Sequence, residues 1–166
     1  MTSLVVRPAQ VSDAAGINAV YNPFIRTSPI TFETVEHTQA QRQSWIEAHA
    51  RSPRHPVFVA EANGGLVGYA NAAEFDPRAA YETSVKVSVF VAPARHKTGA
   101  GKALYAALFG ALGRQDVHRA YALIVAPNPA SVALHERFGF TYVSTLSEVG
   151  RKFGRYYDVM WFEKRF

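Results

Sequence analysis

One strand–loop–helix unit constrains the fold of this chain more than any other feature. From Thr83 to Val91, valines alternate with polar or aromatic residues, as expected for a strand with two different faces. Pro93 ends this strand, and Gly99 opens an apolar helix after a basic, glycine-containing loop. Because the first N–H groups of a helix lack internal partners, this order predicts an α/β fold with a phosphate site at the helix start.

Two familiar phosphate motifs do not match the stretch RHKTGAGKAL. A Walker A loop would need glycine where His96 stands and Ser or Thr where Ala103 stands. A dinucleotide fingerprint would need a third glycine at the position of Leu104. Taken alone, the stretch therefore leaves two interpretations open: a phosphate loop, or an ordinary glycine turn into a buried helix.

The remaining pattern alternates strands and helices and predicts one α/β domain over residues 1–166 with a mixed sheet. Ser12–Asp13, Thr38 with Gln41, and Asn128–Pro129 are the expected helix starts. The further expected strands are Leu4–Val6, Val57–Ala60, Leu66–Ala72, Ala120–Val125, Phe140–Val143 and Tyr156–Phe162.

Composition narrows the functional classes. The chain has no cysteine, which removes thiolate catalysis and fits a reducing compartment. Its net charge of +5 comes partly from short basic clusters, which suit a compact phosphate ligand better than an extended duplex. With no apolar run of membrane-spanning length and no secretory signal, we expect a cytoplasmic protein that binds neither a membrane nor nucleic acid.

Several segments together resemble one family. The segment VFVAP followed by ARHKTGAGKAL is similar to the acetyl-CoA-binding core of the GNAT N-acetyltransferases, with His96 in place of the usual Arg or Gln. The segments TFE, PRAAY, SVALHERFGF and VGRKFGRYYDV resemble the phosphinothricin or methionine sulfoximine acetyltransferase subfamily. The resemblance covers nearly the whole chain, in the family's order.

The resemblance implies a GNAT-like domain whose mixed, mostly antiparallel sheet is flanked by helices and splayed at the acetyl-CoA site, between strands ending near Val91 and Val125. It implies that pantetheine lies along the first strand and that backbone amides of the glycine loop hold the pyrophosphate. The cofactor-binding residues would be Val89, Phe90, Val91, His96, Lys97, Thr98, Gly99, Ala100, Gly101, Lys102, Asn128 and Ser131.

Amine acetylation requires loss of a proton from the ammonium, and the departing thiolate can take one up. His135 is the candidate acid or base, since it shares a helix face with Asn128 and Ser131. The alternative is a histidine that is satisfied between helix and sheet.

Lys86 stands where the subfamily is expected to have a glutamate base, and an ammonium is not a base unless burial strongly lowers its pKa. Three interpretations follow. The base is Glu82, or otherwise Glu33, Glu74 or His135 through water. Lys86 binds an anionic group of a different substrate. Or the protein binds acetyl-CoA and acetylates poorly.

The resemblance places Phe32, Glu33, Arg78 and Tyr81 at the acceptor pocket, where Arg78 would grip a carboxylate or phosphinate. It also implies a homodimer. The six histidines show no metal-ligand spacing, so no metal is expected. The predicted activity is acetyl transfer to the amine of a small amino-acid-like substrate by direct attack. The alternatives are another acceptor class, such as a polyamine, an aminoglycoside or a protein N-terminus, and an acyl-CoA-binding module.

Overall fold

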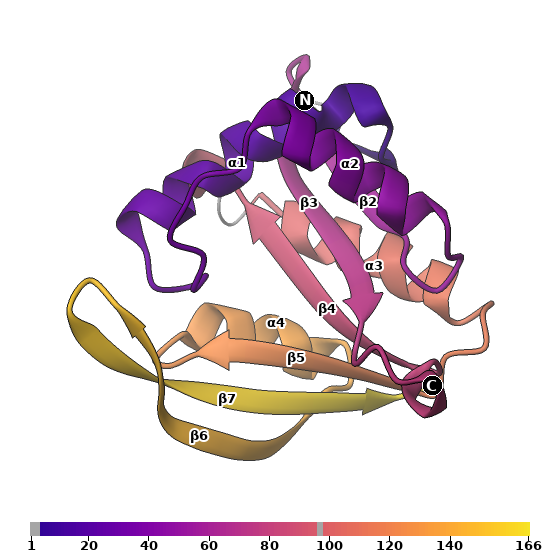
Figure 1. The fold of residues 1–166 in the computed structure, drawn as a ribbon. Helices are drawn as coiled ribbons and strands as arrows, with labels where there is room; N and C mark the ends of the chain where they lie inside the picture. The colour runs from indigo at the N-terminus through magenta and orange to yellow at the C-terminus, as the bar shows by residue number, and fades with distance from the viewer. Residues whose placement is uncertain (1–3, 96–97) are drawn as a thin grey trace.

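A computed structural model describes residues 4–95 and 98–166 of the chain. These residues form one seven-stranded sheet in the order β1-β2-β3-β4-β5-β7-β6, with four α-helices packed on it (Figure 1). The predicted α/β fold with a mixed sheet is confirmed. The strands are β1 Val5–Pro8, β2 Val57–Ala62, β3 Gly65–Glu74, β4 Ser84–Val91, β5 Arg119–Val125, β6 Thr141–Lys152 and β7 Arg155–Arg165. The helices are α1 Ala14–Thr27, α2 Gln39–Ala50, α3 Ala100–Leu112 and α4 Pro129–Arg137.

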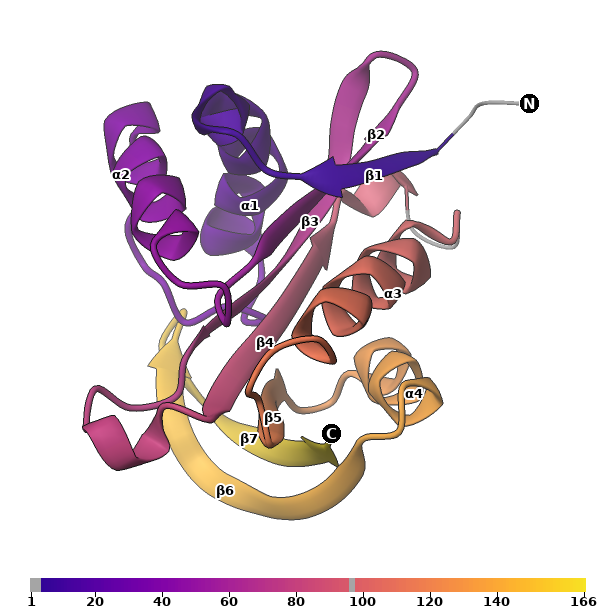
Figure 2. The ribbon, with the colours of Figure 1, turned by 90° about the vertical axis from the view of Figure 1, so that its right-hand side faces the viewer.

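The helices cover the two faces of the sheet in pairs. Helices α1 and α2 lie on one side, and α3 and α4 lie on the other (Figure 2). Each side has its own apolar cluster: Ile17, Phe24 and Tyr69 belong to the first, and Leu104, Leu108 and Phe162 to the second. Because side chains alternate along β4, this strand contributes residues to both clusters. Val85 and Val87 are buried on the side of α3, while Phe90 packs toward α1.

The sheet opens in its middle. Every neighbouring pair of strands is antiparallel except β4 and β5, which are parallel. This parallel pairing lasts only from Ser84 to Lys86, opposite Arg119 to Tyr121. Beyond these residues the two strands diverge, as Figure 1 shows. The splay expected between Val91 and Val125 is therefore present.

Helix starts follow the local sequence closely at three places. The Thr38 hydroxyl accepts from the Gln41 N–H at 3.2 Å while the Gln41 side chain accepts from Thr38 N–H at 2.8 Å, a reciprocal capping box. At α4 the cap is a single bond, in which the Asn128 side-chain oxygen accepts from Ser131 N–H at 3.1 Å. Gly99 precedes α3 with φ +86°, a left-handed conformation that favours glycine.

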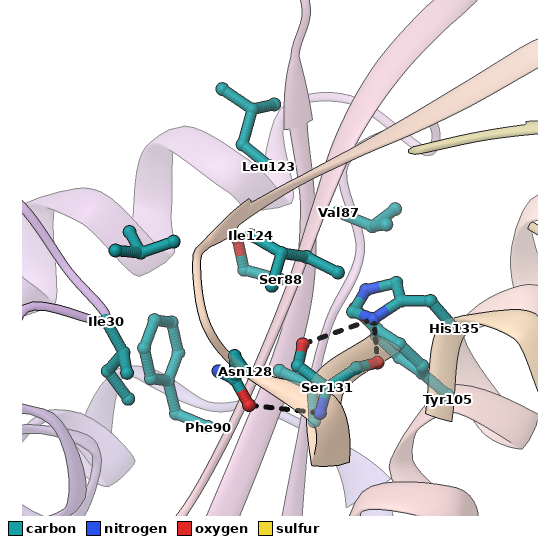
Figure 3. A pocket seen from close by; sticks show the side chains of 12 residues that line it. Ile30, Val87, Ser88, Phe90, Tyr105, Leu123, Ile124, Asn128, Ser131 and His135 are labelled. Atoms are coloured by element: carbon teal, nitrogen blue, oxygen red, sulfur yellow. Dashed lines mark hydrogen bonds between the residues drawn. The ribbon is translucent and has the colours of Figure 1, made fainter. Parts of the chain in front are cut away.

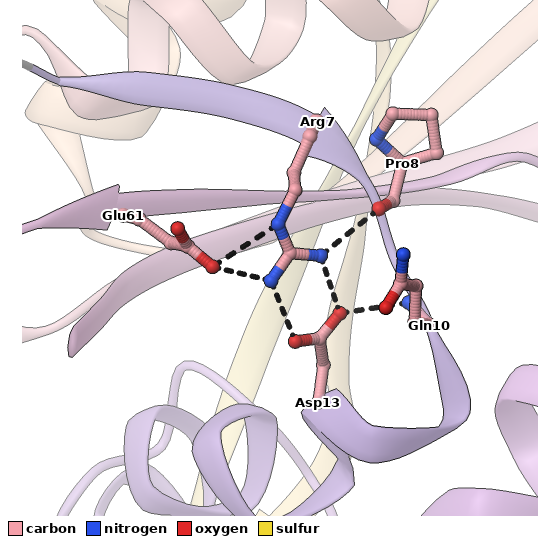
Figure 4. A network of polar contacts seen from close by, with 5 residues as sticks. All are labelled: Arg7, Pro8, Gln10, Asp13 and Glu61. Carbon is pink, nitrogen blue, oxygen red and sulfur yellow. Dashed lines mark hydrogen bonds and ion pairs between the residues drawn. The ribbon is translucent and has the colours of Figure 1, made fainter. Parts of the chain in front are cut away.

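The first helix starts at the expected residue, Asp13, but the Asp13 side chain makes no capping hydrogen bond to α1. A short 3-10 turn, Val11–Asp13, comes before α1, and the Asp13 carboxylate accepts from Gln10 N–H at 2.7 Å. Arg7 binds the same carboxylate through two nitrogens at 2.8 Å and also pairs with Glu61 (Figure 4). These bonds to Arg7 lower the pKa of Asp13. Arg7 of β1 thus links Asp13, at the start of α1, to Glu61 of β2.

The two closing strands are longer than predicted. The sequence predicted Phe140–Val143 and Tyr156–Phe162, but β6 continues to Lys152 and β7 to Arg165. Strand β6 lies at the sheet edge and is exposed along most of its length, so apolar residues do not alternate along it. Its register shifts between Leu146 and Gly150, where Glu148 has φ +50°. An edge strand with a bulge lacks the period on which the prediction rests.

None of the helices in the described part of the chain is both long and apolar enough to cross a membrane.

Candidate active site

The gap between β4 and β5 forms a cavity system. A narrow cavity of about 70 Å³ lies between residues 87–90 of β4 and 123–125 of β5. A larger one, of about 430 Å³, adjoins it and runs to the start of α3. The residues that line both are Ile30, Val89, Phe90, Asn128 and Ser131. Together the cavities offer an elongated site with a narrow end inside the sheet.

The wide end of this site is lined by the first residues of α3. Gly99, Ala100, Gly101 and Lys102 line the larger cavity together with Val91. The opening N–H groups of a helix carry the positive end of its dipole and have no intrahelical acceptor. Lys102 and Thr98 are exposed here, whereas His96 and Lys97 lie outside the described residues. The chemistry of this end suits an anionic group held by main-chain donors.

The wall between the strands offers unpaired main chain. Strand β3 pairs with β4 on one side, but on the β5 side residues 87–90 of β4 have no strand partner. Buried backbone groups require hydrogen-bond partners, so an extended, amide-containing ligand can complete the sheet at this place. Val89 and Phe90, both expected cofactor contacts, lie on this segment.

His135 lies at the narrow end in a closed hydrogen-bond network (Figure 3). Its Nδ1 is 2.7 Å from the Ser131 carbonyl oxygen, so Nδ1 carries the hydrogen. Its Nε2 then accepts from the Tyr105 hydroxyl at 2.8 Å. Burial of the ring, which is 4% exposed, lowers the pKa of His135. The imidazole is therefore neutral near pH 7, with its accepting nitrogen on Tyr105.

Tyr105 is a site residue that the sequence analysis did not single out. It is fully buried on α3 and lines the narrow cavity, and burial raises the pKa of its hydroxyl. In the sequence it follows Leu104 within an apolar helical stretch, and this pattern predicts a core residue. The available signal was its hydroxyl, because a buried tyrosine requires a polar partner.

Lys86 lies where the paired and splayed parts of the sheet meet. It stands opposite Ala73 of β3 and Tyr121 of β5 and is half-buried. The described residues give its ammonium no hydrogen bond or ion pair, although its charge helps to lower the pKa of Asp76. The lysine does not line either cavity, although the next residue along the strand, Val87, lines the narrow one.

Two candidate residues after β3, the expected acceptor contact Arg78 and the expected base Glu82, are already paired. The Arg78 guanidinium donates to both carboxylate oxygens of Asp76, at 2.8 and 3.0 Å. It also lies 5.0 Å from the centre of the Tyr81 ring. The Glu82 carboxylate accepts from Arg54 at 3.1 Å. Both pairs are at the surface, with the Arg78 side chain 72% exposed and that of Glu82 62% exposed. Such pairs are weak and can exchange for a ligand.

Phe32 and Glu33 lie in the loop between α1 and α2, on the other side of the gap. The same loop supplies Ile30, a wall of both cavities that the sequence did not reveal. The Phe32 ring packs toward Tyr157 of β7, with centroids 6.3 Å apart. Glu33 is exposed. The structure thus brings the loop and the hairpin β6–β7 together.

The described residues contain no cluster of three His, Cys, Asp or Glu side chains that is placed to hold a metal ion.

Comparison with known proteins identifies the fold family. Residues 6–161 match the family model described as an acetyltransferase (GNAT) domain. The chain belongs to the GNAT acetyltransferase family. Its splayed sheet, with a glycine-capped helix at the wide end of the gap, is the part of this GNAT domain that holds the cavities.

The GNAT chain is similar along almost its whole length to named acetyltransferases. It is 44% identical to a phosphinothricin N-acetyltransferase of Streptomyces coelicolor, covering 96% of this chain and 94% of that protein. It is 34% identical to an L-methionine sulfoximine/L-methionine sulfone acetyltransferase of Pseudomonas paraeruginosa, covering 95% and 91%. A phosphinothricin acetyltransferase of Sinorhizobium meliloti, crystallised with acetyl-CoA, superposes with a TM-score of 0.92 at 27% identity, covering 98% and 88%.

Proposed function

We propose that this GNAT protein transfers an acetyl group from acetyl-CoA to the amine of a small amino-acid-like substrate of the phosphinothricin or methionine sulfoximine type. The observation that carries the proposal is the gap between β4 and β5, whose cavities lead from the start of α3 to His135. Similarity to proteins named for these substrates supports the acceptor class. A cytoplasmic location belongs to the same proposal.

The residues of the gap fit acetyl-CoA in shape and charge. The N–H groups at the start of α3 suit the pyrophosphate, with Lys102 nearby, and the open edge of β4 at Val89 suits the amides of pantetheine. Asn128 and Ser131 line the far wall. Bound in this way, acetyl-CoA supplies an activated thioester at the narrow end of the site.

The protein's own residues then have separate tasks. His135 is the member of its hydrogen-bonded pair with Tyr105 that can carry a proton. Once Nε2 has released the Tyr105 hydroxyl, it can take up the proton that the attacking amine loses, directly or by way of Glu82 and water, and pass that proton to the leaving sulfur. Arg78, Tyr81, Phe32 and Glu33 border the acceptor. Glu82 remains the proposed base through water, although Arg54 holds its carboxylate at the surface.

Lys86 favours an acidic acceptor. The residue is half-buried, the described residues give its ammonium no hydrogen bond or ion pair, and such a cation attracts a carboxylate or phosphinate. This is the one observation that separates the proposed substrate class from polyamines and aminoglycosides, which are cations. A protein N-terminus lacks a neighbouring carboxylate and fits less well.

A homodimer is part of the proposal. Exposed apolar side chains gather on the hairpin β6–β7: Tyr142, Val143, Leu146, Val149, Phe153 and Tyr156. A patch of this kind commonly marks a protein interface. Light scattering at several concentrations would test the assembly.

An acceptor panel tests the activity. Purified protein, acetyl-CoA and a thiol-detecting reagent should release coenzyme A rapidly with phosphinothricin or methionine sulfoximine, and slowly with spermidine or kanamycin. If both amino-acid-like acceptors were inert while spermidine reacted, the substrate class would be wrong. Tight acetyl-CoA binding without turnover on any amine would instead favour the acyl-CoA-binding module.

A further inference from the structure

Lys152 lies at the end of β6 in an unusual position for a lysine. Its side chain is almost completely covered, since the residue is 5% exposed. Its ammonium donates to the carbonyl oxygens of Thr31 at 2.7 Å and Ser28 at 2.8 Å, with a longer contact of 3.5 Å to Phe24. These carbonyls use all three N–H donors of the ammonium. Lys152 is therefore committed to main-chain contacts.

These three carbonyls belong to one short segment of the chain. Phe24 is in the last turn of α1, and residues 28–31 are the beginning of the loop that follows. A cation is favourable at the C-terminal end of a helix, where the dipole is negative. Figure 1 shows the hairpin β6–β7 reaching across the gap to this loop. A single side chain thus ties the loop to a hairpin more than 120 residues away in sequence.

Two further contacts hold the same loop. The Tyr21 hydroxyl and the Thr31 hydroxyl are 2.6 Å apart, which anchors the loop to α1. On the outer side, the Phe32 ring lies directly on the backbone of β6 at Gly150. A Cβ atom at position 150 would overlap the edge of the Phe32 ring, so only glycine allows this approach. The loop is thereby fixed from α1 and from the hairpin.

The fixed loop carries residues of the proposed site. Ile30 lines both cavities, and Phe32 and Glu33 are the proposed acceptor contacts. We infer that Lys152 is a positioning residue for acceptor binding: its ammonium holds residues 28–33 at the distance from β4 that the acceptor requires. The inference rests on the proposed function for the acceptor, but the anchoring itself depends only on the contacts.

Lys152→Met tests the anchor, because methionine has a similar length and volume without donors. The acceptor KM should rise about tenfold, since small displacements of positioning groups carry large kinetic costs. The acetyl-CoA Kd and kcat should change less than about threefold, because the start of α3 and His135 are untouched. Amide hydrogen exchange of residues 28–33 should become faster. Arg151→Met is the matched control: it removes a neighbouring exposed cation, and both readouts should stay at the wild-type level.

Gly150→Ala tests the same anchor without removing a charge, and serves if Lys152→Met does not fold. Its Cβ would displace Phe32, so the acceptor KM should again rise more than kcat falls. An unchanged acceptor KM in both folded variants would overturn the inference, even if their melting temperatures fell. Unchanged exchange of residues 28–33 would also overturn it. If the wild type reacts with no amine, the proposed function fails, and the exchange measurement alone decides whether Lys152 anchors the loop.

Discussion

The two ends of the site are built from different chemical groups. At the proposed cofactor end, the cavity is lined by the main chain at Gly99–Lys102 and by the open edge of β4, both set by secondary structure. At the acceptor end, the groups are side chains on loops, and several already have partners within the protein, such as Arg78 with Asp76. Backbone groups tolerate sequence change, whereas side-chain contacts define the substrate.

The contrast between the two ends indicates where specificity resides. A loop such as RHKTGAGKAL can carry His96 in place of Arg or Gln and keep its amides. The proposed acceptor end has Lys86 in place of the glutamate that the family resemblance implies, and in our proposal this difference changes both the charge and the proton chemistry of the site. Substitutions should therefore affect the two ends in different ways.

The largest change in activity is expected for a substitution of His135, at the narrow end of the site. His135→Ala should lower kcat about 100-fold, since general acid–base groups contribute at least this much. The wild-type kcat should be constant from pH 7 to 8 and fall only below the ordinary histidine pKa of about 6.5, because burial lowers the pKa of His135 and keeps the ring neutral above it. Steady-state kinetics across this pH range measures kcat. If the acetyl-CoA Kd of His135→Ala rose as steeply as its kcat fell, His135 would bind the cofactor and would not act in proton transfer.

A smaller effect is expected at the cofactor end. Gly99→Ala forces an alanine into φ +86°, and relief of this strain would shift the opening amides of α3. The acetyl-CoA Kd should rise about tenfold, which corresponds to about 1.4 kcal/mol. Gly64→Ala is the control: it has φ +75° and, like Gly99, nothing within 4 Å of the Cβ that alanine would add, but it lies in the turn between β2 and β3. Isothermal titration calorimetry should give Gly64→Ala the wild-type Kd, and equal losses in both variants would contradict a local role.

The smallest change in kinetic constants is expected for substitutions of Lys86. Lys86→Met should raise the KM of an acidic acceptor about fivefold, the value of a partly exposed ion pair. Lys86→Glu should raise it further through repulsion, while the acetyl-CoA Kd stays constant.

The opposite result at Lys86 is equally informative. If Lys86→Glu increased kcat on phosphinothricin or methionine sulfoximine, the lysine would occupy the place of a missing base and would not recognise the acceptor. Kinetics with both substrates and both variants separates these two roles.

Local sequence was sufficient wherever a structure depends on neighbouring residues. The alternation along Ser84–Val91, the capping box at Thr38 and the start of α4 at Asn128 could all be predicted, because each depends on residues a few positions apart. Family resemblance added the splay of the sheet. The edge strand β6 was too short in the prediction, since its bulge interrupts the pattern.

The amino-acid sequence alone was enough to predict the order of the elements and the glycine that precedes α3, whereas phosphate binding by this loop and the acceptor role of Lys86 stay predictions. Which side chains meet depended on the tertiary structure. It joined Tyr105 to His135 and Lys152 to the carbonyls of residues 28 and 31. The reason is that a helix cap forms within a few residues, whereas a buried hydrogen bond between distant segments requires the sheet to bring them together.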